Sequence, residues 1–283
     1  MAGDLAIEVH GLRKAYPGGV VAVDGVDLSV PRGEVFALLG PNGAGKTTTV
    51  EILEGFRRPD AGSVRVLGTD PRHGDDAWRA RVGIVLQGTG AFDDLTVTEV
   101  VRHFARFYPR PDDPAAVIER VGLAAKRKAR ARTLSGGQKR RLDVALGIIG
   151  RPELLFLDEP TTGFDPEARR EFWALVKDLA GTTILLTTHY LDEAETLADR
   201  VGVLASGRMA AVAAPADLGD RAAAPATVRW IGPDGPHATV TDTPTAVVAE
   251  LAARSGGEVP GLTVTRPTLE DVYLKLIGDE EPS

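Results

Sequence analysis

The segment at residues 40–48, GPNGAGKTT, constrains this chain more than any other. It fits the pattern GxxxxGK[ST], in which a glycine-rich loop between a strand and a helix holds phosphate groups. Residues 34–39 before it form an apolar run of strand length, and residues 48–54 after it are suited to a helix. Because glycine lacks a Cβ atom, successive backbone N–H groups can curl around phosphate oxygens. The segment therefore predicts a phosphate-binding loop in an α/β fold, the alternative being a chance glycine turn.

The backbone of such a loop does not hold a triphosphate alone, because the positive end of an exposed helix contributes only about 0.3–1 kcal/mol. We expect Lys46 to supply positive charge and Thr47 to offer its hydroxyl to Mg²⁺. The residues of this loop that we expect to contact a nucleotide are Gly40, Pro41, Asn42, Gly43, Ala44, Gly45, Lys46, Thr47 and Thr48.

The composition excludes several other kinds of chemistry. The chain has 283 residues, which allows one large domain or one large and one small domain. Its formal net charge of −7 argues against nucleic acid as the main partner, so local geometry must hold an anionic nucleotide. The absence of cysteine excludes disulfides, thiolate catalysis and cysteine zinc sites. No apolar run approaches the roughly 18–20 residues that span a bilayer, and the N-terminus lacks the features of a signal peptide. We therefore expect a soluble, cytosolic chain.

Two later segments predict catalytic residues at the carboxyl edge of a sheet. In LLFLDEP, residues 154–160, four apolar residues indicate a buried strand that ends at Asp158 and Glu159, where α/β sheets place their ligands. Asp158 can hold Mg²⁺ directly or through water, and Glu159 can orient or deprotonate an attacking water. Residues 183–188 indicate another buried strand, which ends at His189. This histidine is either a simple strand cap or, at the same edge, a contact for the γ-phosphate.

Three further features gain meaning only beside an ATP site. Residues 134–138, LSGGQ, precede a predicted helix at 139–149, and they form either a second anion-binding helix start or a serine N-cap in a flexible turn. Tyr16 lies in a turn and can stack on adenine, although read alone it is better explained as a half-buried residue at a strand end. Gln87 follows a predicted strand at 82–86 and would otherwise be an ordinary loop residue.

The rest of the chain predicts more strands and helices. Strands are expected at residues 7–12, 20–30 and 63–67, helices broken by prolines at 96–128, and a helix at 167–180. Residues 209–226 are rich in alanine, which indicates a linker. Beyond it we expect strands at 227–231, 238–241 and 262–265 and helices at 244–254 and 268–277, a small α+β appendage.

Together these motifs resemble the ATPase subunit of ABC transporters. Residues 40–47 match the Walker A motif, Gln87 the Q-loop, and residues 134–138 are a full match to the signature LSGGQ. Residues 154–159 resemble Walker B, residues 163–165 the D-loop and His189 the H-loop, while Tyr16 stands where the family keeps its adenine-stacking aromatic. The order and spacing hold from about residue 5 to residue 215. The D-loop departs from the common SALD, since it reads GFD here.

The resemblance implies a P-loop NTPase core with an antiparallel β subdomain and a helical signature subdomain. It places the ATPase domain at residues 1–215, the helical subdomain at about 89–150, and a C-terminal accessory or regulatory region at 216–283. It implies ATP and Mg²⁺ as ligands. The implied catalytic residues are Glu159, His189, Lys46 and Gln87, and the implied metal-binding residues are Thr47, Gln87 and Asp158.

The resemblance also implies partners. Two copies would face head to tail as a homodimer, so that the partner copy closes each ATP site with Ser135, Gly136, Gly137 and Gln138. A transmembrane permease subunit would dock near residues 92–95, which places the protein peripherally on the cytoplasmic face of the cell membrane. Residues 54–59, EGFRRP, and residues 267–273, PTLEDVY, resemble drug-resistance-type export ATPases. We therefore expect export of a drug-like or lipophilic compound, although import stays open.

Other functions remain as alternatives. A non-transport ABC ATPase could act as a switch on nucleic acid or the ribosome, but residues 48–134 lack the sustained heptads of repair proteins, and the chain has one ATPase unit where translation factors carry two. A binding-only module is disfavoured by Asp158, Glu159 and His189. The tail is either a dimer-stabilising or regulatory piece, or a helix packed back on the core.

Overall fold

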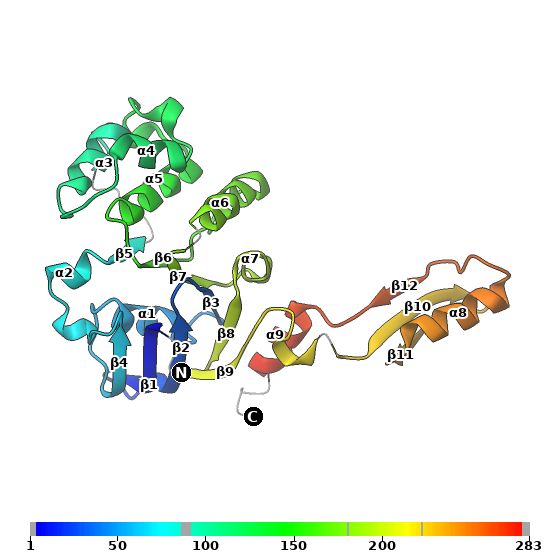
Figure 1. The fold of residues 1–283 in the computed structure, drawn as a ribbon. Helices are drawn as coiled ribbons and strands as arrows, with labels where there is room; N and C mark the ends of the chain where they lie inside the picture. Colours follow the sequence, from blue (N-terminus) through cyan, green and yellow to red (C-terminus); the bar gives the residue numbers. More distant parts are fainter. Residues whose placement is uncertain (1–3, 86–91, 180, 222, 279–283) are drawn as a thin grey trace.

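The computed structural model describes residues 4–85, 92–179, 181–221 and 223–278, and it contains three sheets. Figure 1 shows a body that carries the two larger sheets and a helical lobe, with an arm that extends away from it. The predicted fold class, an α/β core with an antiparallel subdomain and a helical subdomain, is confirmed.

The central sheet has the strand order β5-β6-β7-β3-β8-β9. Its strands are β3 (Val35–Leu39), β5 (Val82–Val85), β6 (Leu154–Asp158), β7 (Thr183–Thr188), β8 (Arg200–Ala205) and β9 (Arg208–Ala213). All neighbours pair in parallel except β8 and β9. The central strands are almost continuous apolar runs because helices or a second sheet cover both faces. Since β7 lies between β3 and β6, the carboxyl ends of these three strands meet at one edge.

A second, antiparallel sheet packs over the phosphate-loop helix α1 (Lys46–Leu53). It consists of β1 (Leu5–Ala15), β2 (Val21–Pro31) and β4 (Ala61–Val66), in the order β2-β1-β4. Val26 of β2, Phe36 of β3 and Leu53 of α1 are buried in one shared core. The helix is thereby held between two sheets, which fixes the loop at its start. The short helix α2 (Asp76–Arg79) adds Trp78 to this core.

The helical lobe lies beyond β5 (Figure 1). It contains α3 (Val97–Ala105), α4 (Pro114–Arg120) and α5 (Gly136–Ile148). Thr96 and Glu99 form a capping box that starts α3, and Asp113 caps α4 ahead of its first-turn proline. Their apolar faces join the core on the second face of the central sheet, together with α6 (Pro166–Asp178) and α7 (Leu191–Leu197). None of the helices in the described part of the chain is long and apolar enough to cross a membrane.

The prediction of a linker at residues 209–226 is wrong for its first part. Residues 208–213 form β9, an edge strand of the central sheet that pairs with β8. Ala210, Ala211 and Ala213 pack against the core there, so small side chains that suggested a linker instead allow close packing. Beyond β9 the chain forms the arm of β10 (Ala226–Gly232), β11 (Gly235–Thr241), β12 (Thr263–Thr265) and α8 (Pro244–Ser255).

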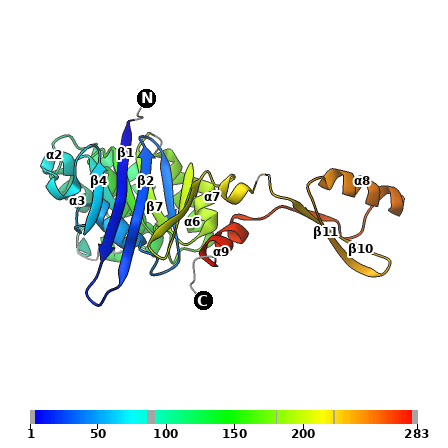
Figure 2. The same ribbon diagram turned by 90° about the horizontal axis from the view of Figure 1, so that it is seen from below.

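The arm is an excursion from which the chain returns (Figures 1 and 2). It has its own small core, built around Val228, Leu251 and Val259. The last helix, α9 (Leu269–Gly278), packs back on the body, where Leu269 and Val272 are buried in the main core. This agrees with the second alternative for the tail. Residues 216–283 therefore include both the arm and α9, which packs on the body.

Candidate active site

The loop between β3 and α1 adopts backbone angles that favour glycine. Gly43 and Gly45 have φ of 83° and 102°. A Cβ atom at Gly40 would lie 2.4 Å from the carbonyl oxygen of Leu204, and one at Gly45 would lie 2.1 Å from that of Ala22. Backbone atoms of neighbouring strands therefore lie so close to the loop that only glycine fits at positions 40 and 45.

The side chain of Lys46 folds back over this loop. Its Nζ atom donates to the carbonyl oxygens of Gly40 at 2.7 Å and Pro41 at 3.1 Å. The side chain is buried, and burial lowers the pKa of its ammonium group, while the charges of Glu159 and Asp158 act in the opposite direction. A cation thus lies across the loop, facing the carboxylates that end β6.

Tyr16 lies against the start of α1. Its hydroxyl group is 3.0 Å from Oγ1 of Thr48, and the guanidinium carbon of Arg57 lies 5.1 Å from the centre of its ring. The turn between β1 and β2 therefore places the predicted adenine-stacking aromatic beside the phosphate loop. Its stacking on a base stays a prediction.

Thr187, at the end of β7, organises the two acidic residues. Its Oγ1 atom donates to Oδ1 of Asp158 at 2.6 Å, and the same oxygen accepts from the backbone N–H of Glu159 at 3.0 Å. The parallel register of β6 and β7, which sets Asp158 opposite Thr187, makes both contacts possible. This residue was not identified from the sequence, where it is one more residue of an apolar strand.

Glu159 occupies a strained turn next to His189. Its φ of 40° is in the left-handed region, which is unfavourable for a residue other than glycine. Its Oε2 atom accepts from Oγ1 of Thr162 at 3.2 Å, and Oε1 lies 3.5 Å from Nδ1 of His189. The side chain of Glu159 is 20% exposed and that of His189 is 39% exposed, so both reach solvent and an incoming ligand. The structure brings together the acid and the histidine that the sequence placed at one edge.

Two buried charged side chains form hydrogen bonds with the turn after β6. Arg140 of α5 donates through Nη2 to the carbonyl oxygen of Asp158 at 2.7 Å and through Nε to that of Pro160 at 3.1 Å. Glu193 of α7, which is fully buried, accepts at Oε1 from Oγ1 of Thr161 at 2.9 Å. Burial lowers the pKa of Arg140 and raises that of Glu193. Sequence reasoning missed both, because charged residues in amphipathic helices usually face solvent.

The signature segment forms the start of α5. Ser135 is the N-cap residue: its Oγ atom accepts from the backbone N–H of Gln138 at 3.3 Å, and its own N–H donates to Oε1 of Gln138 at 3.1 Å. A Cβ atom at Gly136 would meet nothing within 4 Å, and one at Gly137 would contact only Ala168. The predicted helix and its serine N-cap are present, but the helix begins at Gly136, three residues before the expected 139, and it lies in the helical lobe, away from α1 (Figure 1).

The metal-binding prediction divides into two parts. Thr47 and Asp158 line one cavity of about 330 Å³ beside the phosphate loop. Hydroxyl and carboxylate oxygens suit Mg²⁺, so these two residues fit the predicted ion. Gln87 lies outside the described residues, and its role stays a prediction. Within the described ranges no group of three or more His, Cys, Asp or Glu side chains could hold a metal by itself.

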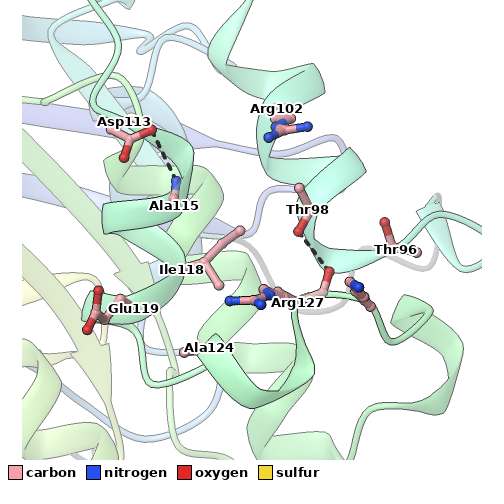
Figure 3. Close-up of a pocket in the computed structure, with 10 residues that line it drawn as sticks. Thr96, Thr98, Arg102, Asp113, Ala115, Ile118, Glu119, Ala124 and Arg127 are labelled. Atoms are coloured by element: carbon pink, nitrogen blue, oxygen red, sulfur yellow. Dashed lines mark hydrogen bonds between the residues drawn. The ribbon is translucent and has the colours of Figure 1, made fainter.

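A larger pocket of about 460 Å³ lies in the helical lobe, between α3, α4 and the segment that follows α4 (Figure 3). Its lining residues include Thr98, Arg102, Glu119 and Arg127 and none of the residues predicted for the ATP site. Size alone therefore does not identify the active site in this chain.

The phosphate loop, the acid pair and the histidine at the carboxyl ends of β3, β6 and β7 define a nucleoside triphosphatase of the P-loop class. The family model described as "ABC transporter" matches residues 23–162. The chain is 46% identical over 220 residues to the daunorubicin/doxorubicin resistance ATP-binding protein DrrA of Streptomyces peucetius, a match that covers 75% of this chain and 66% of that protein. It is 40% identical to the daunorubicin resistance ATP-binding protein DrrA3 of Streptomyces coeruleorubidus, covering 98% of this chain and 97% of the relative.

Similarity extends to the Nod factor export ATP-binding protein I of Ralstonia nicotianae, which is 40% identical over 97% of this chain and 94% of its own length. Among solved structures, cbiO1 from Clostridium perfringens, part of the ABC transporter complex cbiONQ, superposes with a TM-score of 0.70 at 28% identity, covering 76% of this chain and 91% of that one. The chain therefore belongs to the ATP-binding proteins of ABC transporters. It binds ATP and is an ATPase.

Proposed function

We propose that this chain hydrolyses ATP to power the export of a drug-like or lipophilic compound through a separate transmembrane permease, at the cytoplasmic face of the cell membrane. The observation that supports hydrolysis is the single edge at which the phosphate loop, Asp158, Glu159 and His189 meet. Export is supported by the relatives, which are named for drug resistance and for Nod factor export.

Nucleotide binding uses the loop as it stands. The phosphates lie against the N–H groups of the loop, and the Nζ atom of Lys46 exchanges the carbonyl oxygens of Gly40 and Pro41 for phosphate oxygens. Tyr16 stacks on the adenine ring. Thr47, Asp158 and Gln87 would hold Mg²⁺, which would neutralise charge on the phosphates.

Glu159 acts on the attacking water. Its carboxylate orients the water and accepts a proton from it, while Thr162 donates to one carboxylate oxygen and the backbone N–H of Glu159 donates to Oγ1 of Thr187, which fixes the turn. His189 lies against the other carboxylate oxygen and contacts the γ-phosphate. Phosphoryl transfer depends mainly on positioning and charge stabilisation, so this fixed edge supplies what the reaction needs.

A second copy of the chain completes each site. The open start of α5, with Ser135, Gly136, Gly137 and Gln138, faces the γ-phosphate of the partner copy in a head-to-tail homodimer. The serine hydroxyl and bare N–H groups suit an anion, and closure excludes water from the reaction. Hydrolysis then depends on assembly.

The test is to tag the protein in its native cell, solubilise the membranes in mild detergent and identify what co-purifies. A polytopic membrane protein in stoichiometric amount supports the transport function, and ATP-dependent movement of a fluorescent lipophilic compound by the reconstituted pair supports export. Recovery only in the soluble fraction, with ribosomes or nucleic acid attached, would contradict transport and favour an ATP-driven switch.

A further inference from the structure

One face of α1 points into the cavity beside the phosphate loop. Thr47 and Glu51 of α1 and its C-cap residue Glu54 follow one another at helical spacing, and all three line the cavity of about 330 Å³ that Asp158 also lines. Glu54 therefore belongs to the metal side of the nucleotide site by position, although no motif includes it.

Glu54 has a buried carboxyl group in which one oxygen atom forms no hydrogen bond. The residue is 7% exposed, and its Oε1 atom has no hydrogen-bond partner within the described structure. Burial, with the nearby charges of Asp158 and Glu51, raises its pKa to about 8. A buried polar atom without a partner is unfavourable in a folded protein, and such atoms frequently contact water or an ion in the functional state.

The neighbouring acid in the same cavity is different. The side chain of Glu51 is 33% exposed, and it forms an ion pair with Nε of Arg57 at 2.6 Å. Its charge is therefore already balanced within the chain. Unlike Glu51, Glu54 forms no ion pair within the described residues, and one of its carboxyl oxygens lacks a hydrogen bond.

We propose that Glu54 is a positioning residue for the magnesium ion that Thr47 and Asp158 hold. With the ion bound, its positive charge would favour the ionised form of Glu54, and the carboxylate would then accept a hydrogen bond from a water molecule of the ion and add negative charge to the cavity. This inference rests on the proposed function, since it assumes that the cavity receives Mg²⁺ together with ATP.

The experiment uses the full chain with Mn²⁺ as a paramagnetic probe in place of Mg²⁺ and a non-hydrolysable ATP analogue. Electron paramagnetic resonance titrations give the Mn²⁺ affinity of the wild type, E54Q and the matched control E51Q. We expect E54Q to bind Mn²⁺ about ten- to a hundredfold more weakly, as is typical for the loss of a group around metal ligands. We expect E51Q to stay close to the wild type.

Nucleotide binding without metal, followed with a fluorescent ATP analogue, verifies that E54Q is folded, and E54D supplies a second variant that keeps the carboxylate and should restore part of the Mn²⁺ affinity. Wild-type Mn²⁺ affinity in E54Q would overturn the inference while leaving the proposed function intact. A loss in E51Q as large as that in E54Q would also overturn it, because any acid of the cavity would then suffice. If divalent cations do not change the nucleotide affinity of the wild type, that result would instead contradict the metal part of the proposed function.

Discussion

The replacement of Glu54 by glutamine should stabilise the nucleotide-free protein at neutral pH and flatten its response to pH. The pKa of Glu54 is about 8 in the folded chain, whereas a carboxyl group in the unfolded chain titrates near its model value of 4.5. Between these pH values the folded state holds a proton that the unfolded state has lost. The free energy of unfolding therefore falls as the pH rises from about 4.5 to 8.

The size of this effect follows from the width of the pH window. Each pH unit between the two pKa values changes the free energy of unfolding by about 1.4 kcal/mol, so at pH 7 the carboxyl group costs about 3 kcal/mol. Solvent screening reduces this little, because Glu54 is 7% exposed. Glutamine has the shape of the protonated acid and does not ionise, so E54Q should regain about that amount at pH 7.

The assay is urea unfolding of the wild type, E54Q and E51Q at pH 5, 6, 7 and 8, with nucleotide and divalent cations removed because bound ligands shift stability. The advantage of E54Q should be small at pH 5 and grow with each step, while E51Q should show a much smaller growth, because the charge of Glu51 is the smallest of the three causes that raise the pKa of Glu54. An advantage of E54Q that is the same at pH 5 and pH 8 would refute the reasoning, because it would mean that Glu54 ionises normally in the folded chain.

Substitutions at three further positions test the catalytic edge and the buried residue behind it. E159Q should bind ATP, dimerise in its presence and turn over about 10²–10⁴-fold more slowly in a steady-state phosphate-release assay, and normal turnover would remove Glu159 from the role of base. T187V keeps the shape but removes the contacts to Asp158 and to the N–H of Glu159, so turnover should fall at least about tenfold in the same assay with little change in ATP affinity. E193A leaves the Thr161 hydroxyl without its acceptor and should lower the free energy of unfolding by about 2–4 kcal/mol in urea, whereas E193Q, which keeps a carbonyl acceptor, should lie near the wild type. Equal instability of the two variants at Glu193 would show that the charge itself is needed.

The parts of the site that could be predicted are those encoded by consecutive residues. A strand, a glycine turn and a helix at residues 34–54 predict the phosphate loop without knowledge of any neighbour. The apolar run before Asp158 and Glu159 likewise predicts a buried strand with acids at its exit, and the run before His189 predicts the next one. Each of these predictions needs only a local pattern and the rule that parallel strands present their carboxyl ends together.

The residues that hold the site in place could not be predicted, because their roles arise from pairing between distant segments. Thr187 contacts Asp158 only because β6 and β7 are neighbours in one particular register. Arg140 and Glu193 lie on helices whose sequences also suit an exposed face, and only the packing of α5 and α7 behind the turn after β6 reveals their contacts. Arg140 and Glu193 differ from ordinary surface residues of a helix because they are buried, and a single sequence does not show burial.

The tail illustrates the same limit and links it to function. Arg221 donates through Nη1 to the carbonyl oxygen of Pro215 at 2.9 Å and through Nε to that of Pro267 at 3.3 Å, so it joins the chain where it leaves the body to the chain where it returns. Its Nη2 atom also pairs with Glu195 of α7 at 2.8 Å. Because α7 begins directly after His189 and Tyr190, the base of the arm is fixed to the element that follows the catalytic edge. Neither the proline spacing nor the alanine content of the segment points to this arrangement. The arrangement depends on the packing of β9 and α9 on the body, so that the chain leaves the ATPase fold to form the arm and then returns to it.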